Sequence, residues 1–399
     1  MIRYILFPAF LAVISTPVFA QPVDLAKTMR DAQSQMDLLL LNTIRYRNTD
    51  NTPYGPRTIE NGKLKLIPKR DWTSGFFPGE AWYLYEYSRN RKKRNIAVNL
   101  TGGLETEKYN AGTHDMGFKI YCSFGNGYRL TGDTGFRTVI LQSARTLSKR
   151  FNAKAGVIRS WDHNRDKWDY PVIIDNMLNL ELLFAATKIS GDSSFYRIAV
   201  THARTTMMHH FRPDNSCYHV VDYDTLTGDV RKKTTHQGYS NESAWSRGQA
   251  WAVYGYTMCY RFTKDTAFLA QAERSAAYML DHKNMPADGV PYWDYDAPGI
   301  PDEERDASAA AVLASALYEL ASYSKTRDYP ARADMILRSL TNHYRYKKGE
   351  GLGFILQHST GSKPAKSEVD VPLIYADYYY LEALLRSKSL TKYTSTSWK

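Results

Sequence analysis

The sequence predicts an all-α fold, an (α/α)6 toroid in which six inner helices alternate with six outer ones. The first observation behind this prediction is a short phrase that recurs between apolar runs. An Asp in the phrase can accept hydrogen bonds from the free N–H groups of the helix that follows. The four phrases are Arg129–Asp133, Lys188–Asp192, Arg261–Asp265 and Lys325–Asp328. They recur at intervals of about 60 to 70 residues, which fits a pair of helices plus a connection.

Polar clusters upstream of these phrases are the second observation. Each cluster begins a helical run of about four turns, and the recurring phrase ends that run. In chain order the clusters contain Asp71, Asp115, Asp175, Arg247 and Asp306, and Val371–Leu385 supplies the sixth inner helix. In a closed ring, helices of the same phase have their N-termini on one face, so these polar side chains are expected to converge. Capping alone explains any single Asp, but it does not require the Trp, His, Gln and Arg beside them.

Length and composition favour one domain over residues 21–399. Hydrophobic residues make up 43% of the 399-residue chain, which is enough for one large core, and no Gly/Ser linker or low-complexity stretch divides it. Few stretches alternate in the way that strands do. Short strands are expected only in the long connections near Cys217–Tyr223 and Gly289–Trp293.

Residues 1–20 read as a secretory signal peptide. Arg3 supplies positive charge, residues 4–13 are almost wholly apolar, and small residues precede an expected cleavage after Ala20. The apolar run is too short to span a bilayer comfortably and contains a proline, which argues against a membrane anchor. The mature protein is therefore expected to be exported, to a periplasm.

The formal net charge of +11 narrows the class of ligand. In an exported protein without a nucleic-acid-binding motif, this charge favours anionic extracellular ligands such as acidic polysaccharides, although general solubility also accounts for it. The chain has 30 Tyr and 8 Trp. Aromatic faces beside carboxylates suit the apolar C–H faces of sugar rings, and aromatic residues at helical spacing also serve as core.

No metal-ligand spacing and no Gly-rich phosphate loop occur in the sequence, so no metal or cofactor is expected. The three cysteines, Cys122, Cys217 and Cys259, allow at most one disulfide. Cys122 and Cys259 lie within apolar helical runs and are expected to be buried thiols.

Five of the polar phrases, taken together and in order, resemble those of the unsaturated glucuronyl hydrolases, a family of α/α-toroid glycosidases. The phrases are Asp71–Phe76, His114–Phe118, Ile174–Met177, Trp245–Trp251 and Tyr375–Leu384. The resemblance implies a substrate left by a polysaccharide lyase, whose non-reducing uronate carries a C4=C5 double bond. Such enzymes hydrate this vinyl ether and do not attack the anomeric carbon.

The resemblance also implies catalytic roles for two aspartates. The residue corresponding to Asp175 donates a proton to C4 and draws water onto C5, and the one corresponding to Asp115 assists. A helix N-terminus favours the carboxylate anion, whereas a second carboxylate close by opposes it. One member of the pair is therefore expected to keep its proton near neutral pH, and the sequence leaves open which one.

Several further residues are predicted to bind the substrate. His114 and Asn176 flank the acids and can hydrogen-bond to them, and family analogy adds His219. Arg247 is a candidate for the uronate carboxylate, because its planar fork suits a carboxylate; a structural ion pair is the alternative. The candidates for stacking on the sugar, with core packing as the alternative, are Trp72, Trp161, Trp245 and Trp251.

The segment His358–Lys363 resembles a serine-and-lysine stretch with which some family members hold a sulfate. In this reading Ser359, Ser362 and Lys363 bind the sulfate with two hydroxyls and an ammonium. A solvated Ser/Gly-rich loop is the alternative.

The predicted partner is an unsaturated acidic oligosaccharide, sulfated or not, and the protein is expected to be a monomer or a weak homo-oligomer. One alternative is an unsaturated rhamnogalacturonyl hydrolase that acts on pectin fragments. Another is a toroid that binds acidic oligosaccharides without cleaving them, which would not need paired carboxylates. A sugar epimerase or a polysaccharide lyase on a similar scaffold would rely on His or Tyr bases.

Overall fold

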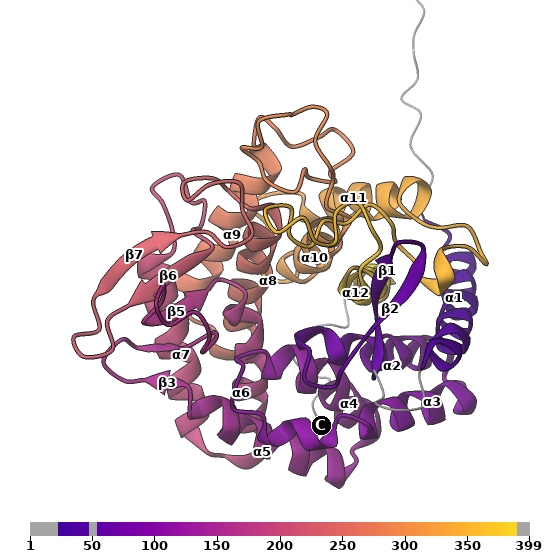
Figure 1. Cartoon of the computed structure of the whole chain (residues 1–399), viewed down its shortest axis with the longest axis horizontal. Coiled ribbons are helices and arrows are strands. Elements are labelled where there is room, and N and C mark those ends of the chain that lie inside the picture. The colour runs from indigo at the N-terminus through magenta and orange to yellow at the C-terminus, as the bar shows by residue number, and fades with distance from the viewer. Residues whose placement is uncertain (1–22, 48–53, 389–399) are drawn as a thin grey trace, which may run out of the picture.

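The computed structural model describes residues 23–47 and 54–388, whose helices form a closed ring (Figure 1). The expected signal peptide, residues 1–20, lies outside these ranges. The inner helices are α2 (Phe76–Ser88), the π-helix η3 (Gly117–Gly125) that continues as α4 (Asn126–Thr131), α6 (Asn176–Ser190), α8 (Ser246–Thr263), α10 (Ala307–Leu320) and α12 (Ile374–Lys388). The outer helices are α1 (Leu25–Tyr46), α3 (Arg91–Gly102), α5 (Thr134–Ser148), α7 (Ser193–His209), α9 (Thr266–Asp281) and α11 (Tyr329–His343).

Each inner helix packs against the next one, and the last closes the ring against the first. Contacts run from α2 through η3, α6, α8 and α10 to α12, and α12 returns to α2. All 14 residues of α10 are buried, whereas the outer helix α3 buries only Lys93, Ala97 and Thr101. Helix α10 is rich in Ala and Ser, whose small side chains let the neighbouring helices approach closely. The closed ring confirms the toroid predicted from the sequence.

The recurring phrase forms the junction between an inner and an outer helix, as predicted. In each copy an Asp side chain accepts a hydrogen bond from a backbone N–H of the helix that follows. The capping residues are Asp133, Asp192, Asp265 and Asp328, at the starts of α5, α7, α9 and α11. At each of these junctions an inner helix ends and an outer helix begins. The inner helices therefore have their N-termini on one face of the ring and their C-termini on the other.

Within residues 23–47 and 54–388, three small antiparallel sheets lie in the connections between helices. They comprise β1 (Gly55–Glu60) with β2 (Lys63–Ile67), β3 (Phe151–Asn152) with β4 (Val157–Ile158), and β5 (Tyr170–Ile173) with β6 (Val220–Tyr223) and β7 (Val230–Thr234). Strand β6 confirms the strand predicted near Cys217–Tyr223. The strand predicted at Gly289–Trp293 is wrong, because Tyr292 makes only an isolated bridge to Arg305. The other strands were not expected, since such short segments show little alternation.

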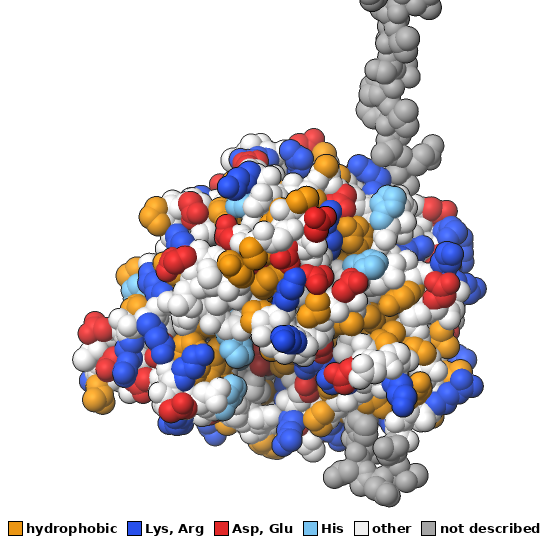
Figure 2. Space-filling model, turned by 45° about the horizontal axis from the view of Figure 1, so that its top comes forward, with side chains coloured by type: hydrophobic (Ala, Val, Ile, Leu, Met, Phe, Trp, Pro, Cys, Tyr) orange, Lys and Arg blue, Asp and Glu red, His pale blue; other side chains and the backbone are white. Residues whose placement is uncertain are grey.

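All three cysteines are free and buried. Within the described ranges, no helix is long and apolar enough to cross a membrane. The same ranges contain no group of His, Cys, Asp and Glu side chains that could hold a metal ion. Acidic and basic side chains are interspersed over the face seen in Figure 2, so the net positive charge is not gathered into one large patch there.

Candidate active site

The pairing of β5 with β6 brings Asp175 and His219 together. Ile173 lies opposite Val220, and the N–H of Ile174 donates to the His219 carbonyl at 3.1 Å. Asp175 follows at the start of α6, where its side chain makes no capping hydrogen bond and so stays available for other contacts. As a result, Nε2 of His219 lies 3.7 Å from Oδ2 of Asp175.

Close packing of η3 against α6 carries Asp115 toward Asp175. A Cβ atom at Gly117 would lie 2.5 Å from Cα of Asn179, so only glycine allows this approach. The N–H of Phe118 donates to Oδ1 of Asn179 at 3.0 Å and fixes the contact. Asp115 stands at the entry to η3, so its negative charge is held near enough to act on the ionisation of Asp175.

Burial raises the pKa of Asp175 to about 7. The positive charge of Arg247 opposes this shift, and the negative charge of Asp115 adds to it. The side chains of Asp175 and Asp115 still expose 12% and 17% of their surface, so solvent reaches both. Asp175 is therefore the acid that holds a proton near neutral pH, and burial, more than the second carboxylate, is the reason.

Two neighbours fix the carboxylate of Asp115. The Thr113 hydroxyl donates to its Oδ2 at 2.6 Å, and Nε2 of His114 lies 3.2 Å from its Oδ1. His114 also faces the side chain of Asn176, whose Nδ2 donates to the Ile158 carbonyl at 2.7 Å. Burial lowers the pKa of His114, although the Asp115 carboxylate acts in the opposite direction. The structure thus places His114 and Asn176 beside the two acids.

The ring of His219 is held in one tautomer. Its Nδ1 accepts hydrogen bonds from the backbone N–H groups of His236 and Gln237, both at 3.1 Å. Burial lowers the pKa of His219 well below its usual value, so the ring is neutral. A neutral imidazole whose Nδ1 accepts must carry its proton on Nε2. His219 therefore points an N–H donor toward Asp175. Neither Nε2 of His219 nor Oδ2 of Asp175 has a hydrogen-bond partner within 3.5 Å among the described residues.

Comparison with known proteins identifies the family of this site. No protein-family model matches the chain. The chain is 49% identical over 354 residues to the unsaturated glucuronyl hydrolase of Formosa agariphila, a match that spans 87% of this chain and 88% of the relative. The chain belongs to the unsaturated glucuronyl hydrolase family. It is therefore an enzyme of the glycosidase class, as the resemblance implied, and not a non-catalytic binding toroid.

Solved structures and further relatives of this hydrolase agree. An unsaturated glucuronyl hydrolase specific for heparin superposes with a TM-score of 0.86 at 46% identity, over 92% of this chain and 98% of the other. The enzyme of Bacillus sp. GL1 superposes with a TM-score of 0.84 at 30% identity, over 92% and 97%. The unsaturated chondroitin disaccharide hydrolase of Streptococcus pneumoniae is 35% identical over 339 residues, or 83% and 85% of the two chains.

Arg247 of the hydrolase is a structural residue in this geometry, not a free carboxylate binder. It is buried, and its Nη1 donates to Oδ2 of Asp306 at 2.7 Å and to the Thr360 carbonyl at 2.6 Å. Its Nη2 donates to the Gly361 carbonyl at 2.6 Å. These acceptors occupy the guanidinium fork that was predicted to bind the uronate carboxylate, and Arg247 forms the ion pair given as the alternative. Arg247 acts on the site through its charge, which lowers the pKa of Asp175.

Asp306 and Asp71 act as helix caps and ion-pair partners. Asp306 caps α10 by accepting from the Ser308 N–H at 3.0 Å, in addition to its pair with Arg247. Asp71 accepts from the Thr73 N–H at 2.9 Å and pairs with Arg57 at 2.8 Å. Both lie at N-termini of the inner ring, as expected, but their carboxylates are committed to capping and ion pairs.

The four tryptophans divide between core and site. Trp251 is fully buried against Phe118 and Tyr379, and Trp245 is buried against His219, with ring centroids 4.5 Å apart. The prediction that these two stack on a sugar is wrong, because no face of either ring is open to solvent. Trp251 instead lies beside the Asp175 carboxyl. The two tryptophans that keep exposed surface are Trp72 and Trp161.

The Ser359–Lys363 stretch does not form the predicted sulfate site. Ser359 is buried and pairs through its backbone with Val371, and its Oγ has no hydrogen-bond partner among the described residues. Ser362 is half-buried and pairs through its backbone with Ser367. The Lys363 ammonium is bound by two carboxylates, described below. The predicted free ammonium is therefore absent, because Lys363 is already paired with these carboxylates, and Ser359 is buried.

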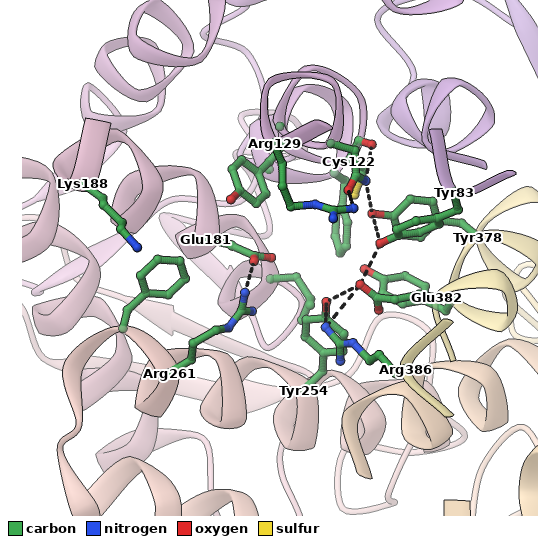
Figure 3. Close-up of a pocket in the computed structure, with 18 residues that line it drawn as sticks. Tyr83, Cys122, Arg129, Glu181, Lys188, Tyr254, Arg261, Tyr378, Glu382 and Arg386 are labelled. Atoms are coloured by element: carbon green, nitrogen blue, oxygen red, sulfur yellow. Dashed lines mark hydrogen bonds and ion pairs between the residues drawn. The ribbon is translucent and has the colours of Figure 1, made fainter. Parts of the chain in front are cut away.

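The ring also holds a cavity of about 100 Å³, shown in Figure 3, which extends from Gly117 and Leu178 near the N-termini of the inner helices to Arg261 and Arg386 at the C-terminal end. Charged groups at this end pair with one another. Arg261 lies 2.9 Å from Glu181, and Glu382 accepts from the Tyr83 hydroxyl at 2.7 Å and lies 3.3 Å from Arg386. The Arg261–Glu181 pair joins α8 to α6, and the Tyr83–Glu382 hydrogen bond joins α2 to α12. Because its carboxylates are tied to arginines and tyrosines, this end supports the ring, and the proton-donor chemistry lies at the N-terminal end.

Sequence reasoning missed the segment that holds His219. His236 and Gln237 act through their main-chain N–H groups, which every residue except proline possesses. No side-chain pattern marks such a role. The sequence offers one hint. His219 is predicted in the site and a long connection follows it, and an imidazole in a site needs a partner for its second ring nitrogen.

Proposed function

We propose that this hydrolase removes the 4,5-unsaturated uronate from the non-reducing end of glycosaminoglycan oligosaccharides by hydrating the C4=C5 bond. The observation that carries the proposal is the buried Asp175, whose pKa is raised to about 7. Protonation of carbon needs an acid that is still protonated at working pH and strong enough to give its proton up. A carboxyl at this pKa meets both conditions.

In the first step the Asp175 carboxyl transfers its proton to C4 of the unsaturated uronate. The π electrons of the C4=C5 bond form the new C4–H bond, and positive charge develops at C5 and the ring oxygen. The carboxylate left on Asp175 and the nearby carboxylate of Asp115 stabilise this charge electrostatically. The Nε2–H of His219 is placed to donate to Asp175 as its charge grows.

In the second step the Asp175 carboxylate takes a proton from a water that attacks C5. The C5–O bond forms, and the acid is regenerated for the next turnover. The product at C5 is a hemiketal, which opens the ring and releases the rest of the oligosaccharide. Protons and electrons balance across the two steps, and one water is consumed.

The relatives support a glycosaminoglycan fragment as the substrate. The structure at 46% identity is that of an enzyme specific for heparin. An aspartate-to-asparagine variant of the Streptococcus agalactiae enzyme, 29% identical with a TM-score of 0.77, was solved with dGlcA-GalNAc6S. The higher identity to the heparin-specific enzyme favours uronate linked to glucosamine over uronate linked to galactosamine. The unsaturated pectin fragments of the neighbouring enzyme class are the alternative.

We further infer that the enzyme works in the periplasm as a monomer or weak homo-oligomer. The signal-like residues 1–20 support export. Cell fractionation with mass spectrometry of the mature N-terminus tests this: export predicts a chain that begins at Gln21 in the periplasmic fraction. Sedimentation of the purified enzyme measures its association.

The experiment that tests the proposed reaction follows the ultraviolet absorbance of the conjugated alkene. Lyase-generated disaccharides from heparin, chondroitin and pectin are mixed separately with the enzyme. The proposal expects the absorbance to disappear fastest with the glycosaminoglycan products. If the absorbance disappears only with the pectin products, the substrate is a pectin fragment and not a glycosaminoglycan fragment. An absorbance that stays constant with all three would overturn the proposed reaction.

A further inference from the structure

The loop 359–371 lies against the active site through two independent anchors. In the first anchor, Arg247 donates to the carbonyls of Thr360 and Gly361, both at 2.6 Å. In the second, Nε2 of Gln237 donates to the Gly361 carbonyl at 2.9 Å, while the backbone N–H of Gln237 donates to Nδ1 of His219. Arg247, whose charge acts on Asp175, thus contacts this loop directly, and Gln237 links the loop to His219. Residues 362 and 363 follow directly in the chain, so these anchors hold them near the groups that act on Asp175.

The Lys363 ammonium lies between two carboxylates, those of Glu303 and Glu304. The Glu303 side chain is mostly buried, and its carboxylate also accepts from Nε1 of Trp293 at 2.8 Å and from the Gly299 N–H at 3.1 Å. These contacts fix Glu303 in place. Glu304 is more exposed, at 32%, and its carboxylate contacts only Lys363 among the described residues. We refer to Lys363, Glu303 and Glu304 as the rim clamp.

The charges of the rim clamp do not cancel. One ammonium faces two carboxylates, so the clamp carries a net charge of about −1 when all three groups are ionised. Burial opposes ionisation of Glu303, but hydrogen bonds from Lys363 and Trp293 prevail and lower its pKa. Two of the three N–H donors of the ammonium bind these carboxylates, and the surplus negative charge of the clamp repels a further anion.

We propose that the rim clamp makes this enzyme select against substrates whose second sugar carries a sulfate. The inference rests on the proposed function, because it concerns the sugar attached to the unsaturated uronate. A sulfate needs free N–H or O–H donors, and the clamp presents carboxylates in their place. An unsulfated N-acetylated second sugar carries no anionic group, so the surplus charge of the clamp does not repel it.

The test compares unsaturated uronate–hexosamine disaccharides without sulfate and with a 4-, 6- or N-sulfate. The main variant is Glu304→Gln, which removes the surplus charge and keeps the size of the side chain. Asp302→Asn is the matched control, because it removes the same charge from an exposed neighbouring residue that has no contact with Lys363. For each protein and substrate, kcat/KM is measured at low and at physiological salt.

The wild-type enzyme is expected to disfavour at least one sulfated disaccharide by about tenfold in kcat/KM, a difference of about 1.4 kcal/mol. Glu304→Gln should raise kcat/KM for that substrate by at least about threefold and leave the unsulfated substrate within twofold, while Asp302→Asn changes neither. The penalty should shrink as salt is added, because salt screens charge repulsion. Equal rates on all disaccharides, or a penalty that Glu304→Gln leaves untouched, would overturn the inference. Loss of activity on every substrate would instead count against the proposed function.

Discussion

Nε2 of His219 lies 3.7 Å from Oδ2 of Asp175, and Nδ1 of the same ring accepts from two backbone N–H groups. The two backbone donors decide the tautomer, so the histidine can only offer a donor to the acid. A donor at this position stabilises the carboxylate more than the neutral acid. The His219 donor therefore stabilises Asp175 directly after proton transfer, when the negative charge of the carboxylate first appears.

Asp175→Asn is expected to lower kcat by about 10² to 10⁴-fold, the usual contribution of a positioned general acid. The amide keeps the size of the side chain but has no proton acidic enough for carbon. The decay of alkene absorbance measures the rate, and circular dichroism checks that the helices remain. Asp166→Asn, at an exposed acid of the connection before β5, is the control. Wild-type rates in Asp175→Asn would remove this residue from the chemistry.

The pH dependence of kcat/KM should show an alkaline limb near pH 7. Only protonated Asp175 can donate, and its pKa is about 7, so activity falls as the pH rises through that value. Asp115→Asn removes a negative charge that helps to raise this pKa, so the limb should move to lower pH. A limb that moves to higher pH in Asp115→Asn would contradict the direction of the coupling.

His219→Ala is expected to lower kcat by about a hundredfold, a typical cost of removing one positioned donor. His219→Gln should recover part of this loss, since an amide N–H can replace Nε2–H. Because the pKa of His219 is held well below its usual value, no limb from this ring is expected between pH 6 and 8. Equal rates in the Ala and Gln variants would mean that the side chain acts by packing alone.

Arg247→Met should lower the free energy of unfolding by about 3 to 5 kcal/mol, because it leaves the Asp306 carboxylate buried and unpaired. The double variant Arg247→Met/Asp306→Asn should recover much of this loss, since the Asn still caps α10 without a charge. Urea unfolding measures both. Because the Arg247 charge lowers the pKa of Asp175, the double variant should also move the alkaline limb to higher pH. A double variant no more stable than the single one would refute this account.

Glu80 on α2 and Asp377 on α12 form a buried acid pair where the ring closes. Burial raises the pKa of Asp377 to about 8, and burial together with the Asp377 charge raises the pKa of Glu80 well above its usual value. The folded protein then holds more protons than the unfolded chain, so stability is greatest below about pH 4 as far as these groups are concerned and falls as the pH rises toward 8.

Glu80→Gln replaces one of the two acids with a group that does not titrate, so the folded state no longer binds an extra proton at this position. The melting temperature of the variant should therefore decline less between pH 5 and pH 9 than that of the wild type. Glu60→Gln, at an exposed acid of β1, is the control and should decline as the wild type does. An equal decline in Glu80→Gln and wild type would show that the pair ionises without cost.

The toroid was predictable because its information is local and repeated. The caps at Asp133, Asp192, Asp265 and Asp328 each depend on a few neighbouring residues, and a backbone N–H at a helix start needs an acceptor wherever the chain goes. The pairing of Asp115 with Asp175 followed from the common phase of η3 and α6. The short strands were not predictable, because their pairing depends on segments far away in the sequence.

By itself the sequence determined the ring, the face that carries the acids, and the family to which the chain belongs. Only the tertiary structure decided which polar residues are free to act. Arg247, Asp71 and Lys363 carry side chains suited to a ligand, yet each is paired with a partner that the fold brings from elsewhere. The protonation of Asp175 was likewise decided by burial, since the free energy of a charge depends on what surrounds it and not on its neighbours in the chain.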